Sequence, residues 1–281
     1  MMQETVDPFW RDPPWRGGRT PFRMGLAEIP EAEWLPEPIA APERERKRAL
    51  MRERGDEVLA RAPGAALAER EAVAAVRETL GGRGGYGVES RAMSLDEAAL
   101  WVPEDLCVLA PGDREPKLVA ACLCSPSYWR LREKIGRPMR EIHAPVPGLN
   151  RALGARVARF LAGLPVGRIF ARRNYLIHRS AEPFQPAAEQ WSYPLEPAAC
   201  RSAFVRSETQ TLRRFPGGAV LFSIRVRSRP LTGIEACPQA AADLLAALAR
   251  MSDDERRAFG YHHHGEALRV YLGDVVAGAG R

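Results

Sequence analysis

Polar side chains alternate along a segment near residue 210 in a pattern that could build a binding site. In the segment FVRSETQTLRRFP, which starts at Phe204, a strand would direct Arg206, Glu208 and Gln210 to one face. A base, an amide and an acid in a row can orient a small polar or cationic ligand, and these three are our candidate catalytic residues. The alternative is that they line the exposed face of an antiparallel sheet.

A second segment that could carry chemistry is MREIHAPVPG, which contains His143. Pro145 and Pro147 follow this histidine closely and restrict the backbone there. A neutral imidazole could ligate a metal or a haem iron, and its affinity should then fall below about pH 6. The alternative is a buried histidine that is hydrogen-bonded to a carbonyl. His178, on a predicted strand, is the competing histidine.

The cysteines and the C-terminal histidines do not form a recognisable metal motif. Five cysteines are an odd number for a chain of 281 residues, which argues against a disulfide framework. We expect Cys122 and Cys124 to point to opposite faces of a strand and to serve as packing residues. Three adjacent residues, His262, His263 and His264, would point about 100° apart on a helix. We therefore expect the surface start of a helix there and no shared metal ion.

An antiparallel sheet is needed to position these side chains. Strands are predicted at 169–179, 203–214 and 219–227, and the last two form a hairpin around Phe215-Pro-Gly-Gly. An earlier hairpin at 105–110 and 117–124 precedes a short helix at 127–135 and an amphipathic helix at 149–164. Other helices are predicted at 42–62, 65–80, from Ser94 with a capping box to Glu97, and at 239–250, 252–259 and 264–275. This order predicts an α+β fold, with helices packed around a PAS-like antiparallel sheet.

The first 40 residues differ in composition from the rest. They combine many prolines with large aromatic residues: Phe9, Trp10, Trp15, Phe22 and Trp34. Proline disfavours regular structure while aromatic side chains are stabilised by burial, so we expect 1–40 to be an extended arm that lies across the body. The length permits one large domain or two small ones. We predict a single domain over 41–281 with a core of about 101–231.

Composition restricts the class of protein further. Hydrophobic residues make up 46% and charged residues 27%, as in ordinary globular proteins, and no apolar run could span a bilayer. The net charge of +6 is carried mostly by arginine, but the basic residues are mixed with acidic ones, so nucleic-acid binding is not favoured. The N-terminal residues lack the order of a secretion signal, and we expect a cytoplasmic protein with no membrane association. We find no Walker loop, no G-x-G-x-x-G turn and no H-E-x-x-H motif.

Two long segments carry a specific resemblance to a known family. The segments CSPSYWRLREKIGRPMREIHAPVPG and RSETQTLRRFP, together with PFRMGLAEI and PEDLCVL, resemble the α subunit of haem-dependent oxidative N-demethylase. The resemblance runs in order from about Pro21 to Leu231. Two positions depart from the family pattern, because Thr209 replaces an arginine and Asn174-Tyr175 replaces an asparagine–tryptophan pair.

The resemblance implies a haem-binding PAS-type fold that oxidises a small secondary amine such as dimethylamine with O2. It implies haem b in this chain, and electrons from NADPH through a separate reductase subunit that carries FMN and a 2Fe–2S cluster. By this analogy His143 ligates the iron, Glu208 contacts the amine, and four residues help to bind the haem: Lys134, Asn174, Arg213 and Arg214. The alternatives are a haem-based gas or redox sensor, a haem-binding protein without catalysis, and a module that has lost its cofactor.

Overall fold

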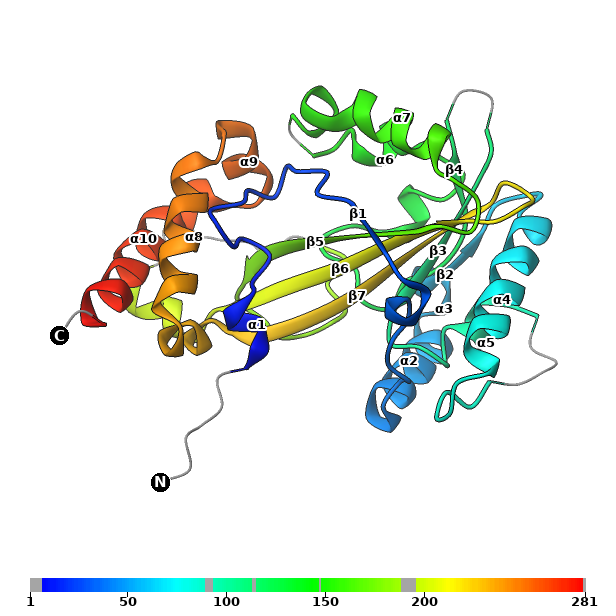
Figure 1. Cartoon of the computed structure of the whole chain (residues 1–281), viewed down its shortest axis with the longest axis horizontal. Helices are drawn as coiled ribbons and strands as arrows, with labels where there is room; N and C mark the ends of the chain where they lie inside the picture. Colours follow the sequence, from blue (N-terminus) through cyan, green and yellow to red (C-terminus); the bar gives the residue numbers. More distant parts are fainter. Residues whose placement is uncertain (1–6, 89–92, 113–114, 147, 188–195, 280–281) are drawn as a thin grey trace.

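A seven-stranded antiparallel sheet forms the centre of the protein. The computed structural model describes residues 7–88, 93–112, 115–146, 148–187 and 196–279. Its strands are β1 (Ala27–Ile29), β2 (Leu59–Arg61), β3 (Asp105–Ala110), β4 (Lys117–Cys122), β5 (Ile169–His178), β6 (Phe204–Arg214) and β7 (Val220–Pro230). They are ordered β1-β5-β6-β7-β3-β4-β2 across the sheet, with antiparallel neighbours. Helices lie around this sheet (Figure 1), and the predicted α+β fold is confirmed.

The β6–β7 hairpin carries most of the predicted site residues. A tight turn joins its strands, and the Phe215 N–H donates to the Ala219 carbonyl at 2.8 Å. Gly218 has a φ of +91°, which glycine adopts without the strain that a Cβ atom would cause. The ladder extends along the whole of both strands, from the turn to Phe204 and Pro230. The predicted hairpin is therefore confirmed, and its second strand ends three residues later than expected, at Pro230.

The register assigns the side chains to two faces, because paired residues of antiparallel strands point the same way. One face, here called the α7 face, lies under α6 (Met139–His143) and α7 (Ala155–Gly163). The opposite face is covered at one end by α4 (Ala66–Gly81) and α5 (Leu95–Ala98). At its other end it packs against α8 (Pro238–Arg250) and α10 (Tyr261–Gly278), with the short α9 (Asp253–Ala258) between them in the chain. Figure 1 shows these three groups of helices around the sheet.

The N-terminal segment crosses the sheet, as the blue trace in Figure 1 shows. It starts with the short helix α1 (Pro8–Arg11), and the described segment 12–26 contains no helix or strand. Trp15 is fully buried, and its indole N–H donates to the Ala240 carbonyl at 2.8 Å. The hydroxyl of Tyr175 in β5 donates to the Arg19 carbonyl at 3.0 Å. Burial of the aromatic rings therefore attaches this segment to the body of the protein.

The helix predicted over 42–62 is wrong in its second half. The structure has α2 (Ala41–Glu53), a single turn of helix α3 (Gly55–Val58) and then β2. Gly55 weakens continuation of α2, because glycine is a poor helix former. Leu59, Ala60 and Arg61 pair with β4 at the edge of the sheet. This pairing is a long-range contact, and the local helical pattern does not reveal it.

The segments on either side of His143 are less regular than predicted. The short helix expected at 127–135 is only a 3-10 turn at Leu131–Glu133. The helix expected at 149–164 begins as a π-helical turn at Asn150–Gly154 and continues as α7. Pro147 lies outside the described residues. No helix in the described part of the chain combines the length and the apolar character that a membrane crossing requires.

Two expectations about cysteine and histidine are also corrected. The sulfur atoms of Cys122 and Cys124 lie 3.9 Å apart in the buried cluster under α4, so they do not point to opposite faces. Residues two positions apart in an extended chain share a face, which is the physical reason. The last helix begins at Tyr261, and it directs His264 into the core while His262 and His263 are exposed. The expected surface position is therefore wrong for His264.

Candidate functional site

Strands β5 and β6 bring four polar side chains together on the α7 face. The register places Asn174 opposite Glu208 and Arg172 opposite Gln210. Because directly opposed residues share a face, these four side chains form one polar row. Glu208 is only 8% exposed. The alternative of a solvent-exposed row is therefore wrong for Glu208, which is buried.

The carboxylate of Glu208 is held by two neutral donors. The hydroxyl of Ser127 donates to one oxygen at 2.5 Å, and the amide of Gln210 donates to the other at 2.7 Å. Each carboxylate oxygen keeps a further lone pair, because an ionised carboxylate can accept about four hydrogen bonds. Glu208 is therefore oriented and still able to accept hydrogen bonds from a cation.

Arg206 has a different environment from the other predicted catalytic residues. It is fully buried, and all three nitrogen atoms of its guanidinium donate hydrogen bonds. Its acceptors are the Ser127 hydroxyl and four carbonyl oxygens, at Ser125, Pro126, Glu182 and Pro183. These bonds join two loops to the sheet. The structure thus gives Arg206 a structural task and little capacity to bind a substrate directly.

His143 lies at the end of α6 and keeps a neutral imidazole. Burial lowers its pKa from 6.5 to about 4, and the positive charges of Arg172 and Lys134 act in the same direction. The imidazole has no hydrogen-bond partner within the described residues. Lys134 is buried next to it, and its ammonium donates to the Ile142 carbonyl at 2.8 Å. A neutral imidazole is the form that a metal ion requires.

Arg172 links His143 to the polar row on the sheet. Its charge acts on His143, and the charge of Glu208 acts on Arg172 in turn. Burial lowers the pKa of Arg172, while Glu208 raises it. The guanidinium donates to the Pro21 carbonyl at 3.3 Å. The sequence patterns did not identify Arg172 as a site residue. Alternation along the predicted strand does place it on the same face as Asn174.

Two polar atoms in this row are buried without a partner among the described residues. They are Nε of Arg172 and the side-chain oxygen of Asn174. Leaving such groups unpaired costs about 1–3 kcal/mol each, so native proteins rarely do it without a ligand or water. These two atoms lie in the row that also holds Glu208. We therefore take the row as the wall of a ligand site.

Two arginines predicted to bind the cofactor are not brought to this site. Arg213 points to the opposite face, where it pairs with Glu31 at 3.0 Å and lies 4.5 Å from the centre of the Trp34 ring. Arg214 donates to the carbonyl oxygens of Leu161 and Ala162 at the end of α7. Both side chains thus hold other elements against the sheet. Of the basic residues predicted from sequence, only Lys134 lies beside His143.

The residues of the α7 face fit a flat apolar group with anionic edges. Phe170 and Leu212, the next pair along β5 and β6, belong to the apolar cluster under α7, together with Leu131, Ile142 and Phe160. Beside this cluster are the neutral imidazole of His143 and the cationic groups of Arg172 and Lys134. Haem needs an apolar surface, an axial ligand and cations for its propionates. The donor set therefore fits haem, and the orphaned Nε of Arg172 could donate to a propionate.

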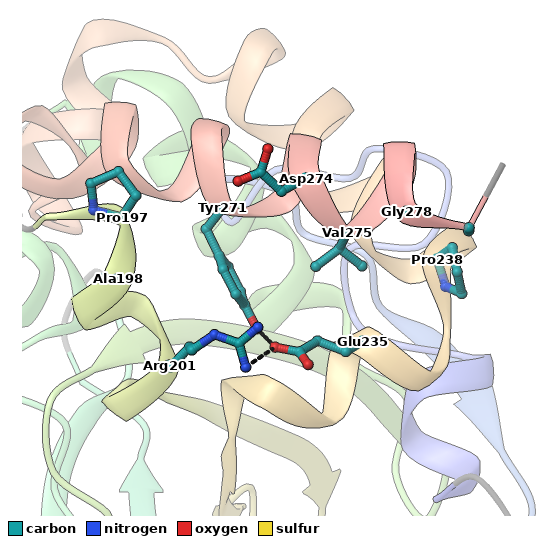
Figure 2. A pocket seen from close by; sticks show the side chains of 10 residues that line it. Pro197, Ala198, Arg201, Glu235, Pro238, Tyr271, Asp274, Val275 and Gly278 are labelled. Carbon is teal, nitrogen blue, oxygen red and sulfur yellow. Dashed lines mark hydrogen bonds and ion pairs between the residues drawn. The ribbon is translucent and has the colours of Figure 1, made fainter. Parts of the chain in front are cut away.

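A separate cavity lies away from these residues, where the C-terminal helices meet. It has a volume of about 600 Å³ and lies between η4 (Pro197–Ser202), η5 (Leu231–Ala236) and α10 (Figure 2). On its floor, Glu235 accepts a hydrogen bond from the Tyr271 hydroxyl at 2.6 Å and pairs with Arg201 at 3.1 Å. Its lining includes none of the residues predicted for the site.

His178, the competing histidine, is fixed within a different group of residues. It is fully buried, its ring stacks on Tyr128 at 4.5 Å, and Nδ1 lies 2.9 Å from the side-chain oxygen of Gln185. The Gln185 amide nitrogen donates to the carbonyls of Ser180 and Glu182, which fixes its orientation. Nδ1 of His178 therefore carries the proton. Within the described residues, no three metal-ligating side chains form a cluster.

The fold and the site define a protein that places a polar wall and a neutral histidine on one face of an antiparallel sheet, where a prosthetic group fits. A family model described as haem-dependent oxidative N-demethylase, alpha subunit-like, matches residues 87–269, well over half of the chain. The chain belongs to this family. The match includes His143 and all of β5, β6 and β7. No curated protein matches the chain.

Proposed function

We propose that this chain is the haem-bearing subunit of an enzyme that demethylates a small secondary amine, similar to dimethylamine, by oxidation. The family supports the general reaction. The observation that carries the proposal is the polar row Arg172, Asn174, Glu208 and Gln210 near a neutral His143. A buried carboxylate with spare lone pairs is suited to a dialkylammonium ion, which has two N–H donors and a small apolar surface.

Each residue of the site has a proposed task. His143 ligates the iron of haem b, and Lys134 and Arg172 neutralise the propionates. Glu208 binds the ammonium group of the amine and Gln210 orients Glu208, while Asn174 supplies a hydrogen-bond acceptor beside them. The haem, when bound, supplies the redox chemistry with O2. The apolar residues under α7 exclude water from the methyl group of the amine.

The domain organisation belongs to the same proposal. We propose one haem-binding, PAS-like domain over 41–281, preceded by the arm at 1–40. Support comes from the order of the elements, with two strands, short helical turns, a longer helix and three strands. The five strands β3 to β7 lie within the proposed core at 101–231. Strands β1 and β2 extend the same sheet from outside that core.

A separate reductase subunit is proposed as the electron donor. The chain has none of the glycine-rich turns that bind a dinucleotide, so NADPH, FMN and the 2Fe–2S cluster are assigned to that partner. The printed family description, alpha subunit-like, agrees with an enzyme of several subunits.

The test is the absorption spectrum of the purified protein with and without dimethylamine. We expect a haem spectrum that changes on titration with the amine, and formaldehyde release when NADPH and a suitable reductase are added. A haem spectrum that responds to O2 but not to amines would indicate a sensor. Absence of haem after reconstitution would rule out both functions.

A further inference from the structure

The hydroxyl of Ser127 lies between Arg206 and Glu208, two charged residues of β6 on the α7 face. Nε of Arg206 donates to the Ser127 oxygen at 2.8 Å, and the same hydroxyl lies 2.5 Å from a Glu208 oxygen. A guanidinium nitrogen can only donate, so the hydrogen of Ser127 cannot point to Arg206. The arrangement directs that hydrogen to Glu208.

The O–H···O distance agrees with a hydroxyl that donates to a carboxylate. Distances of about 2.5–2.7 Å are typical of a hydroxyl that donates to an ionised carboxylate. The amide nitrogen of Gln210 donates a hydrogen bond to the other oxygen of Glu208 at 2.7 Å. The two donors come from different elements, one from the loop after β4 and one from β6 itself. The rotation of the carboxylate is therefore restricted from both sides.

The loop that carries Ser127 is fixed by buried hydrogen bonds. Asp105, which is fully buried, accepts from the backbone N–H groups of Cys124 and Ser125, both at 2.8 Å. Arg206 donates to the Ser125 carbonyl at 2.8 Å. The backbone N–H of Tyr128 donates to the Gln185 carbonyl at 2.8 Å. Ser127 therefore acts from a rigid support, and little conformational entropy is lost when its bond to Glu208 forms.

We propose that Ser127 is a positioning residue that holds the ionised carboxylate of Glu208 in the orientation that binds the amine. The inference rests on the proposed function, because it assigns Glu208 to the substrate. It also gives Arg206 a defined part. The guanidinium does not meet the substrate, and it determines the direction in which the Ser127 hydroxyl donates.

The test uses haem-loaded full-length protein and dimethylamine titrations monitored by the haem spectrum. Ser127→Ala should bind dimethylamine about tenfold more weakly, which is about 1.4 kcal/mol, because the carboxylate of Glu208 is no longer held in its binding orientation. Ser127→Thr keeps the hydroxyl and should bind like the parent. The matched control is Ser207→Ala, which removes a hydroxyl next to Glu208 in β6 but on the opposite face, where Ser207 donates to the Arg227 carbonyl.

A double variant separates action through Glu208 from general damage to the site. On the Glu208→Gln background, Ser127→Ala should cause no further loss of amine affinity, because the oriented carboxylate is already absent. A full additional tenfold loss on that background would overturn the proposal. The proposal would also be overturned if the single variant Ser127→Ala, which keeps Glu208, bound dimethylamine as tightly as the parent.

A second readout does not depend on the amine or on turnover. Infrared difference spectra should show one carboxylate band that disappears in Glu208→Gln, shifts in Ser127→Ala and returns in Ser127→Thr. An unshifted band in Ser127→Ala would contradict the proposal. If the parent shows no response to amines but the band shifts as expected, the proposed function fails while the Ser127–Glu208 contact stands.

Discussion

Asn174 lies directly opposite Glu208 in the β5–β6 ladder, and both side chains project onto the α7 face. Glu208 receives hydrogen bonds from Ser127 and Gln210, whereas the Asn174 side-chain oxygen has no partner among the described residues. Glu208 is thus oriented by the protein and keeps lone pairs for a cation, while the Asn174 oxygen has no protein partner among the described residues and is left for a ligand. This asymmetry makes the pair the most informative place to test the site.

Removal of the proposed iron ligand should abolish stable haem binding. His143→Ala should lose the Soret band or retain it weakly, and added imidazole should restore part of it. Because burial lowers the pKa of the unligated His143 to about 4 and iron competes with the proton, acid should release haem only at or below about that pH and not near pH 6. The control is His178→Gln, whose spectrum should match that of the parent. A parent-like spectrum in His143→Ala and a lost one in His178→Gln would reverse the assignment.

Neutralisation of the carboxylate should weaken amine binding and leave haem in place. We expect Glu208→Gln to lose about 1.5–3 kcal/mol of amine binding free energy, the contribution of a hydrogen bond to a charged group. The measurement is the amine-induced change in the haem spectrum. Thr209→Ala, at an exposed neighbour on the other face, is the control and should titrate like the parent. Equal titrations of Glu208→Gln and the parent would remove Glu208 from the site.

Arg172 and Arg173 are adjacent in sequence and lie on opposite faces of β5, which makes them a matched pair. Arg172→Met removes the cation beside His143 and should lower haem affinity about tenfold, the scale of one charged hydrogen bond. Arg173→Met removes an ion pair with Asp12 and should leave haem affinity unchanged. Haem transfer to apomyoglobin measures the haem affinity of both variants. Equal haem loss from the two variants would argue against the role of Arg172.

Buried histidines should make folding sensitive to acid. The pKa of His178 is lowered from 6.5 to about 3, chiefly by burial and also by the charge of Arg206. The unfolded chain therefore takes up this proton first as the pH falls. The contribution of His178 to stability is complete above about pH 6.5 and is lost between there and about pH 3, by up to about 1.4 kcal/mol per pH unit.

Urea unfolding between pH 4 and pH 6 measures this effect. His178→Gln should reduce the slope of the unfolding free energy against pH by about one proton, because glutamine does not titrate. Thr209→Ala, at an exposed position whose side chain does not titrate, should keep the parent slope. An unchanged slope in His178→Gln would mean that His178 is not the neutral buried group described above.

The purified chain should not oxidise NADPH by itself. It lacks a recognisable dinucleotide-binding turn, so amine-dependent NADPH consumption should appear only with a reductase present. The measurement is NADPH absorbance with dimethylamine, with and without that component. Consumption at enzymatic rates by the chain alone would show that a nucleotide site was overlooked.

Local patterns determined the elements that carry the site. Alternation along 204–214 predicted a strand with Arg206, Glu208 and Gln210 on one face, and the turn at Phe215 predicted the partner strand. Both depend on backbone geometry over a few residues, which the amino-acid types largely specify. The polar segment around His143 was recognised in the same way, through its residues and their order. These parts could be read before any packing was known.

Only the tertiary structure decided what each of these side chains contacts. Arg206 and Glu208 have the same parity on β6, yet one is surrounded by loop carbonyls and the other keeps free lone pairs. Ser127, which orients Glu208, is 81 residues away in sequence. The charge of Arg172 acts on His143, whereas Arg213 forms an ion pair with Glu31 on the opposite face. Alternation assigns a face, but the loops and helices that cover that face come from distant parts of the chain. Their packing is a long-range property that no local pattern contains.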